Sequence, residues 1–303
     1  MTDTDPVGPP AAHSVPAARV GLPLWGFAGW AGKVYASDTR ARDYLEQYAR
    51  VFGAVEGSST FYSTPTADTV RRWAEQTPTS FRFCFKLPRQ LTHDLLLAGV
   101  ADDARAFVSH MSILGPRLGP FMVQLPAELG PQHLGRIDAL LTALPSTHRF
   151  AVEVRHRAFF ESAPLADRLR DLLAEHDADR VVLDTTGVRT GPQSHPDVAK
   201  ARHPKPDLPI VEEATSHRPI VRFIGHPVPS HNEAGLADWA ARIARWVSEG
   251  RHPYLFIHCP NDLHAPDIAR RAHALLSDRI AIDPMPAWPG ESRETRTGQL
   301  SLL

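Results

Sequence analysis

The chain has 303 residues, 43% of them hydrophobic, and a formal net charge of −1 at pH 7. This content is enough for a large core, and the balanced charge gives no overall field that would attract nucleic acid or an anionic membrane. No stretch comes near the roughly 18 consecutive apolar residues of a transmembrane helix, so we expect no membrane span.

The beginning of the chain predicts a disordered leader. Residues 1–20 are rich in Pro and Ala and lack the basic start and apolar core of a secretory signal peptide. The two cysteines, Cys84 and Cys259, fall inside predicted strands, which favours a reducing compartment over a disulfide framework. We therefore expect a cytoplasmic protein with a leader over 1–22, one domain over 23–283 and a flexible tail over 284–303.

Eight short apolar runs, each followed by a helical pattern, organise the rest of the chain. In chain order they are Leu24–Trp30, Ala54–Ser59, Phe81–Lys86, Phe121–Leu125, Phe150–Arg155, Arg180–Asp184, Ile220–Ile224 and Tyr254–His258. Strands that alternate with helices indicate βαβ units and a parallel sheet. Eight such units in about 260 residues predict an α/β fold, a single-domain (β/α)8 TIM barrel.

The segments between the runs carry helical periodicity, with Pro or Gly at many of their ends. The expected helices are Arg40–Val51, Ala67–Gln76, Asp102–Leu114, Pro131–Leu144, Pro164–His176, Leu236–Ser248 and Pro266–Leu276. The sixth unit differs, because Pro, Gly and His recur between Asp184 and Ile220. We expect a long loop there, with short helices at most over Pro196–Ala201 or Val211–Thr215.

Strand alternation predicts which side chains point into the barrel. In Phe81–Lys86, three Phe residues alternate with Arg82, Cys84 and Lys86, and the Phe side chains are expected to pack outward against helices. The same rule points a polar set inward near the C-terminal strand ends, where barrel enzymes carry their active sites. This set is Glu56, Lys86, Gln124, Glu153, Arg155, Asp184, Arg222 and His258.

Two interpretations of this polar set compete. In the structural one, Glu56 and Glu153 neutralise Arg155 and Arg222 in an internal salt-bridge lattice, because an unpaired buried ion costs several kcal/mol. In the functional one, Lys86, Arg155 and Arg222 bind a phosphate or carboxylate, while Glu153 or Asp184, expected on neighbouring strands, acts as general acid or base. We favour the functional interpretation because these residues recur at one end of many strands.

Histidines are numerous, 16 in all, and several fall at or just past strand ends. His93 and His156 are candidate proton partners for the carboxylates. A divalent metal is a possible cofactor, and its ligands would be Glu56, Glu153, Asp184 and His258. The sequence has no His-Glu-x-x-His motif to support such a site.

Several of these segments together resemble a known family. Phe27-Ala-Gly-Trp30 resembles a strand-1 signature Thr-Ser-Gly-Trp, and Val55-Glu-Gly-Ser-Ser-Thr-Phe-Tyr62 resembles a strand-2 motif Val-Glu-(Ile/Val)-Asn-(Ser/Thr)-Thr-Phe-Tyr. Further matches are Phe83-Cys-Phe-Lys86, Leu91-Thr-His93, Gln124-Leu-Pro126, Glu153-Val-Arg-His156 and Asp184. By these motifs the chain is similar to the YecE-like family, domain of unknown function 72. The resemblance implies a TIM barrel of the kind also used by metal-dependent isomerases and abasic-site endonucleases, and it implies no particular reaction.

The chain departs from the family pattern at three strands. Gly57 or Ser58 replaces the usual Asn of the strand-2 motif, and the strand-7 motif Arg-x-His-Gly appears as Arg222-Phe-Ile-Gly-His226. Of an Asn-Asn pair at strand 8, only Asn261 remains. The family's site residues therefore carry over more safely at strands 2 to 6 than at strands 7 and 8.

We predict an enzyme that acts on a small anionic substrate at the C-terminal mouth of the barrel, with phosphoester hydrolysis as the specific hypothesis. The candidate catalytic residues are Glu56, His93, Glu153, His156 and Asp184. The candidate substrate-binding residues are Trp30, Tyr62, Lys86, Gln124, Arg155, Arg222, His258 and Asn261. One alternative is a metal-dependent sugar isomerase or lyase. Another is a non-catalytic binder of an anionic ligand or single-stranded nucleic acid, although the neutral net charge disfavours nucleic acid. The substrate and the oligomeric state stay open.

Overall fold

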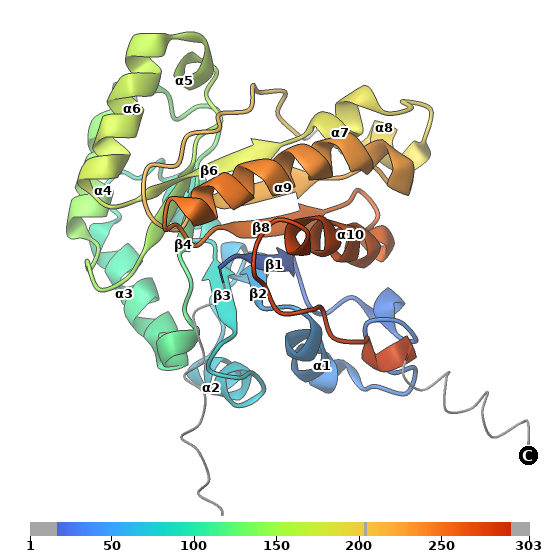
Figure 1. Ribbon diagram of the computed structural model, residues 1–303. Helices are drawn as coiled ribbons and strands as arrows, with labels where there is room; N and C mark the ends of the chain where they lie inside the picture. Colours follow the sequence, from blue (N-terminus) through green and yellow to red (C-terminus); the bar gives the residue numbers. More distant parts are fainter. Residues whose placement is uncertain (1–16, 203–204, 292–303) are drawn as a thin grey trace, which may run out of the picture.

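The computed structural model describes residues 17–202 and 205–291. Eight parallel strands form a nearly closed barrel in the order β3-β2-β1-β8-β7-β6-β5-β4, with helices around it (Figure 1). The strands are β1 (Arg19–Leu22), β2 (Ala54–Gly57), β3 (Arg82–Phe85), β4 (Phe121–Gln124), β5 (Phe150–Glu153), β6 (Asp179–Asp184), β7 (Ile220–Ile224) and β8 (Tyr254–His258). The predicted single-domain (β/α)8 barrel is confirmed.

The seam of the barrel lies between β3 and β4. Only two isolated bridges, Phe83 to Leu118 and Lys86 to Met122, join their edges. The backbone N–H groups of Leu87 and Gly119 also donate to the carbonyls of Met122 and Phe83, at 3.0 and 2.8 Å, so a few backbone contacts close the barrel across this seam.

Ten α-helices are present in the described residues. They are α1 (Tyr44–Val51), α2 (Ala67–Glu75), α3 (Ala101–Met111), α4 (Leu134–Ala143), α5 (Ala158–Glu161), α6 (Ala163–Glu175), α7 (Thr186–Thr190), α8 (Pro196–Arg202), α9 (Glu233–Ser248) and α10 (Ala265–Ser277). Short 3₁₀ or π turns occupy Ala28–Trp30, Ala41–Asp43, Ser58–Phe61, Gln90–Asp94, Ser112–Arg117, Pro131–His133, Pro229–Asn232 and Asp262–His264. None of these helices is long and apolar enough to cross a membrane.

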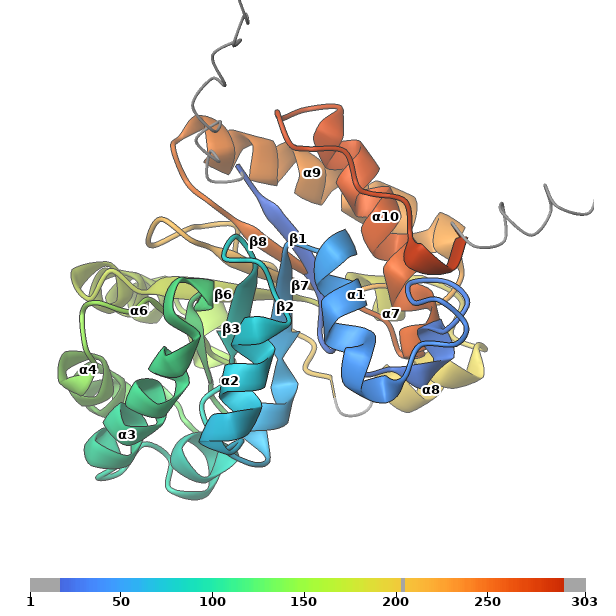
Figure 2. The same ribbon diagram turned by 90° about the horizontal axis from the view of Figure 1, so that it is seen from below.

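The first strand lies earlier in the chain than predicted. The apolar run Leu24–Trp30 is a loop that ends in a 3₁₀ turn, whereas Arg19–Leu22 pairs with both β2 and β8 (Figure 2). Pro23, which has no N–H to donate, follows the strand directly. Residues 19–22 of the predicted leader are therefore part of the barrel, and residues 1–16 lie outside the described chain.

The predicted tail also begins later than expected. Trp288 is completely buried, and the N–H of Gly290 donates to the carbonyl of Lys33 at 3.0 Å. Residues 284–291 therefore pack against the barrel. Residues 292–303 lie outside the described chain.

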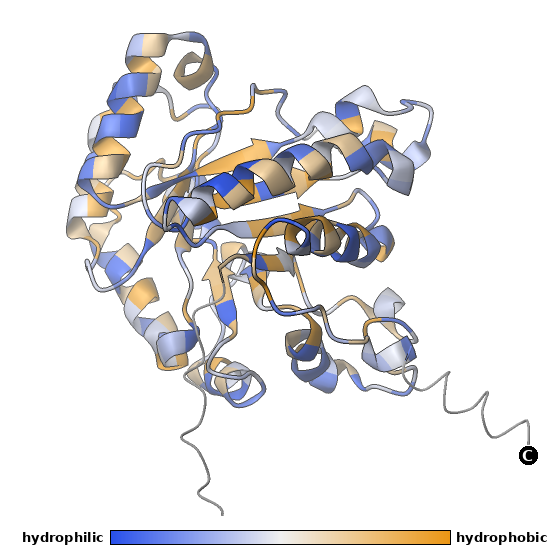
Figure 3. Cartoon of the chain, in the orientation of Figure 1, coloured by the Kyte–Doolittle hydropathy of each residue, from blue (hydrophilic) through white to orange (hydrophobic). Residues whose placement is uncertain are grey.

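The two faces of the strands separate as alternation predicts. Phe81, Phe83 and Phe85 pack outward in the large core beneath the helices. Cys84 points inward and belongs to a second, inner cluster with Ala54, Met122, Ala151, Val181, Ile220, Tyr254 and Phe256. The strands are accordingly apolar along most of their length, while hydrophilic residues gather on the helices (Figure 3). The polar side chains that follow this inner layer form the site.

The connection from β6 to β7 is the long irregular segment that the sequence predicts. Its short helix over Pro196–Ala201 is confirmed as α8, whereas Val211–Thr215 is not helical. The connection also contains α7 and, just past residues 203–204, Lys205.

Candidate functional site

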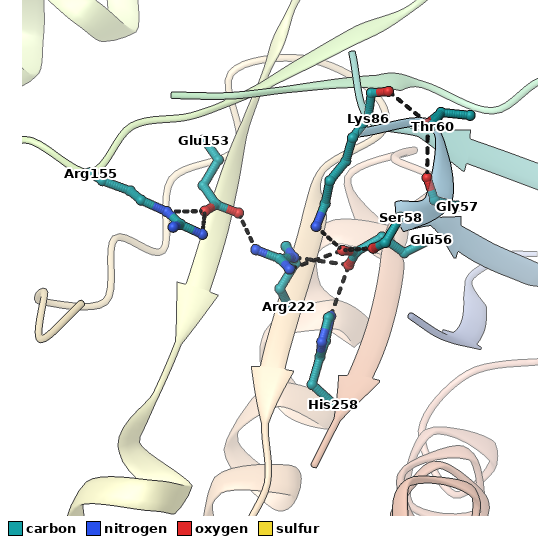
Figure 4. A network of polar contacts seen from close by, with 9 residues as sticks. All are labelled: Glu56, Gly57, Ser58, Thr60, Lys86, Glu153, Arg155, Arg222 and His258. Atoms are coloured by element: carbon teal, nitrogen blue, oxygen red, sulfur yellow. Dashed lines mark hydrogen bonds and ion pairs between the residues drawn. The ribbon is translucent and has the colours of Figure 1, made fainter. Parts of the chain in front are cut away.

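Arg222 on β7 is the centre of a buried charge network (Figure 4). Its guanidinium binds Glu56 of β2 in a bidentate way, with Nε–Oε2 and Nη2–Oε1 distances of 2.9 Å each. Its third nitrogen, Nη1, lies 2.5 Å from Oε2 of Glu153 on β5. The other oxygen of Glu153 pairs with Nη2 of Arg155 at 2.6 Å. The network therefore links opposite sides of the barrel through one arginine.

Glu56 accepts from three further side chains. Lys86 Nζ lies 2.7 Å from its Oε1, and His258 Nε2 lies 2.8 Å from its Oε2. The hydroxyl of Ser58 adds a longer bond of 3.3 Å to Oε1. Because the carboxylate is completely buried, these donors and Arg222 replace the hydration that it loses.

The neighbouring cations keep both carboxylates ionised. Burial by itself raises the pKa of Glu56, but Arg222, Lys86 and His258 lower this pKa well below its usual range. Burial likewise opposes ionisation of Glu153, and Arg222, Arg155 and Lys86 lower its pKa to about 2. At neutral pH these two residues are therefore fixed negative charges rather than proton donors.

His258 is neutral at pH 7, because burial lowers its pKa to about 4 although Glu56 opposes the shift. An ionised carboxylate only accepts, so Nε2 of His258 must carry the proton and donate to Glu56. The other ring nitrogen, Nδ1, then has a free lone pair. Among the described residues, none donates a hydrogen bond to it.

A pocket of about 290 Å³ opens beside this network at the C-terminal mouth. Its walls are formed by Pro23, Leu24, Ser58, Phe61, Tyr62, Lys86, Gln124, Lys205, Arg222, His258, Cys259 and Asp262. Four polar side chains in these walls, those of Tyr62, Gln124, Lys205 and Asp262, form no hydrogen bond or ion pair within the described residues, and Gln124 is only 7% exposed. Burial, and then Arg222, lower the pKa of Lys205 to about 8.

Comparison with known proteins places the chain in a family. A family model described as "Protein of unknown function DUF72" matches residues 19–291. The chain is also 34% identical over 277 residues to the UPF0759 protein YecE of Escherichia coli, a match that covers 90% of this chain and 98% of that protein. The chain belongs to the DUF72 family. This confirms the resemblance found in the sequence.

Solved structures of DUF72 proteins share the barrel. One from Thermotoga maritima superposes with a TM-score of 0.67 at 20% identity, covering 86% of this chain and 99% of the other. One from Enterococcus faecalis superposes with a TM-score of 0.64 at 18% identity, covering 89% and 98%. At these identities the likeness concerns the fold alone.

Most of the predicted DUF72 site residues meet at the mouth. Glu56, Lys86, Gln124, Glu153, Arg155, Arg222 and His258 all belong to the network or to the pocket wall. Tyr62 stands at the rim, 81% exposed. Among the described residues His93 forms no bond to either carboxylate, and its Nδ1 lies 2.9 Å from the hydroxyl of Thr92. Its ring packs edge-on against Phe61 with centroids 5.0 Å apart, and burial and Arg155 lower its pKa.

The structure does not bring Asp184 to Glu153. Asp184 follows the outward-facing Val182 by two residues, and its Oδ2 accepts from the indole of Trp239 on α9 at 2.6 Å. Its Oδ1 accepts from the backbone N–H of Thr186 at 2.8 Å. The carboxylate therefore lies on the helix side of the sheet, where it holds α9 and the start of α7.

Three other candidates also have local partners outside the network. Nδ1 of His156 accepts from the N–H of Ala158 at 3.2 Å, and Oδ1 of Asn261 accepts from the N–H of Leu263 at 3.1 Å. The ring of Trp30 is completely buried, and its Nε1 donates to the carbonyl of Asp262 at 2.8 Å. These contacts fix the loops at the mouth.

The described residues do not fit the predicted metal site. Of its four candidate ligands, Asp184 lies on the other face of the sheet, and Glu56 and Glu153 already accept from Arg222. No group of three or more His, Cys, Asp or Glu side chains within residues 17–202 and 205–291 is arranged to hold a metal ion.

Sequence reasoning missed Lys205 and Asp262. Both lie in irregular segments, where neither strand alternation nor helical periodicity says which way a side chain points. The one signal for Lys205 was its place in the long β6–β7 connection, because long loops in compact domains are often functional.

Proposed function

We propose that this DUF72 protein is an enzyme that binds a small anionic substrate, with a phosphate or carboxylate group, at the C-terminal mouth of the barrel. The observation that carries the proposal is the ammonium of Lys205. It lines the same pocket as Lys86 and Arg222, and it forms no ion pair with any described residue. A cation without a direct ion-pair partner in a partly desolvated wall costs free energy that a bound anion recovers.

The charges around the pocket support the same conclusion. Four cations, Lys86, Arg155, Lys205 and Arg222, face three carboxylates, those of Glu56, Glu153 and Asp262. Burial raises the pKa of Asp262, and the ammonium of Lys205 opposes this shift. The salt-bridge lattice and the binding site therefore coexist, since the lattice holds Lys86 and Arg222 in fixed positions for a ligand.

For the reaction we propose hydrolysis of a phosphoester. Nδ1 of His258 takes a proton from a water molecule whose oxygen bonds to phosphorus. The ester P–O bond breaks, and the leaving oxygen takes a proton from the ammonium of Lys205. Lys86 and Arg222 stabilise the negative charge on the phosphoryl oxygens. A bound anion opposes the cations that lower the pKa of His258, and so it makes Nδ1 a stronger base.

Turnover of a panel of phosphomonoesters, phosphodiesters and carboxylic esters by wild type and by His258→Gln tests this proposal. We expect kcat for the best substrate to fall by about 10²- to 10⁴-fold in His258→Gln. The dissociation constant of methylphosphonate, which has no ester bond, should stay close to that of wild type. His217→Gln, an exposed position, is the matched control. Binding of methylphosphonate without turnover of any ester would contradict the enzyme and leave a binding protein.

We further propose that the protein works in a reducing compartment, the cytoplasm. Its two cysteines, Cys84 and Cys259, are both free thiols and both buried. Proteins of oxidising compartments more commonly pair their cysteines.

A further inference from the structure

An apolar pocket lies next to the charged one. A second pocket of about 320 Å³ is lined by Pro23, Leu24, Trp25, Gly26, Ser58 and Ser59. Three of these residues, Pro23, Leu24 and Ser58, also line the charged pocket. The two spaces therefore meet along a common wall formed by the end of β1 and the turn after β2.

The side of the apolar pocket formed by Trp25 is held in place by packing and by a hydrogen bond. The Trp25 ring packs edge-on against Trp73 on α2, with centroids 5.1 Å apart, and against Phe83 on β3 at 5.9 Å. The hydroxyl of Tyr35 donates to the carbonyl of Trp25 and fixes its backbone. This wall is thus held from both sides, as a preformed ligand pocket requires.

Space is open beside Gly26. A Cβ built at this position would meet no atom within 4 Å, and its backbone is not in the left-handed region. A larger side chain at position 26, in the wall of the apolar pocket, therefore meets neither a steric clash at its Cβ nor backbone strain.

We propose that the substrate carries a flat apolar group next to its anionic group. The inference rests on the proposed function, because it places the anion on Lys86, Lys205 and Arg222 and the flat group against Leu24 and Trp25. Each pocket is near or below the lower end of the usual size range of ligand sites, about 300–1,000 Å³, and together they fit a ligand with two parts. Apolar side chains next to a cationic wall match a molecule that is charged at one end only.

Calorimetric titration with phenylphosphonate and methylphosphonate tests the inference. Both carry the same anionic group, and neither has an ester bond that the enzyme would consume. We expect wild type to bind phenylphosphonate about tenfold more tightly or better, because burial of a ring adds apolar contact area. Benzoate and acetate, titrated in the same way, show whether the site prefers a phosphoryl group or a carboxylate.

The variant Gly26→Leu places a large side chain in the wall of the apolar pocket. It should reduce the preference for phenylphosphonate to within about twofold while the affinity for methylphosphonate stays unchanged. The control is Gly135→Leu on α4, where an added Cβ also meets nothing within 4 Å. This control should keep the full preference.

The outcomes separate the two proposals. If methylphosphonate binds and phenylphosphonate binds no better, the flat group is refuted and the anion site stands. A preference that survives in Gly26→Leu also refutes the inference, since the ring would then lie elsewhere. If none of the four anions binds, the proposed function and the inference both fail.

Discussion

Glu56 shows most clearly how single residues determine this site. Its two carboxylate oxygens accept hydrogen bonds from Arg222, Lys86 and His258 and are fully buried. The fixed carboxylate therefore determines where each of these side chains lies. The sequence predicted this residue because strand alternation fixes the direction of a side chain in the middle of a strand. The prediction that Asp184 points inward beside Glu153 was wrong, because Asp184 shares the outward face of Val182, two residues before it.

Glu56→Gln should destabilise the protein strongly. The amide leaves Arg222 and Lys86 buried with too little negative charge, which costs about 3–5 kcal/mol. Urea denaturation measures the loss. Glu161→Gln, which removes an exposed pair with Arg157, is the control and should unfold like wild type. A loss in Glu56→Gln no larger than in this control would show that the network is not a structural anchor.

His258 predicts a pH dependence of stability. Its folded pKa of about 4 lies below its ordinary value of 6.5, so the unfolded chain takes up the proton first as the pH falls. The stability contributed by neutral His258 is complete above pH 6.5 and is lost as the pH falls to 4 and below, by about 3 kcal/mol in total.

The measurement is the free energy of unfolding of wild type and His258→Gln between pH 6.5 and 5.5, where Glu56 and Glu153 stay almost fully ionised in the folded and in the unfolded chain. The variant should have a shallower slope, and His217→Gln should keep the slope of wild type. Identical slopes in all three proteins would mean that His258 is not held neutral.

At the scale of elements, β1 is where sequence and structure differ most. The run Leu24–Trp30 is longer and more apolar than Arg19–Leu22, and so it gives the stronger strand signal. The barrel instead needs a glycine where β1 approaches β2, since a Cβ at Gly21 would lie 2.2 Å from the carbonyl oxygen of Ala54. Such a close approach between two strands cannot be read from one strand's own pattern.

Gly21→Ala should therefore lower the free energy of unfolding by about 1–3 kcal/mol or more, as other overpacked cores do. Thermal unfolding followed by circular dichroism checks this. Gly135→Ala, at an open helical position, should leave the melting temperature equal or slightly raised. Equal melting temperatures for Gly21→Ala and wild type would argue against this register of β1.

The β6–β7 connection is the other element that the sequence describes only in outline. Its length, irregularity and the short helix α8 were predictable from its Pro, Gly and His content. The position of Lys205 at the pocket was not, because the path of a loop depends on contacts with the rest of the barrel.

For the whole molecule, the barrel gathers at one mouth the charges that the sequence spreads over 200 residues. Arg222 joins β2 and β5 across the interior, and Lys86 and His258 approach from β3 and β8. The TIM-barrel fold could be predicted because the alternation of strand and helix patterns repeats eight times. Misplacing the first strand by a few residues does not change the predicted number of strand–helix units. The charge balance at the mouth could not, since it depends on Lys205 and Asp262 in loops.

The central claim is that this mouth binds a small anion through Lys205, and calorimetric titration of methylphosphonate into Lys205→Met tests it most directly. We expect the dissociation constant to rise about tenfold or more relative to wild type, because the variant removes a charge-assisted contact. Lys200→Met, at an exposed position on the nearby helix α8, should bind like wild type. Equal affinity in Lys205→Met and wild type, or no binding to wild type at all, would contradict the account.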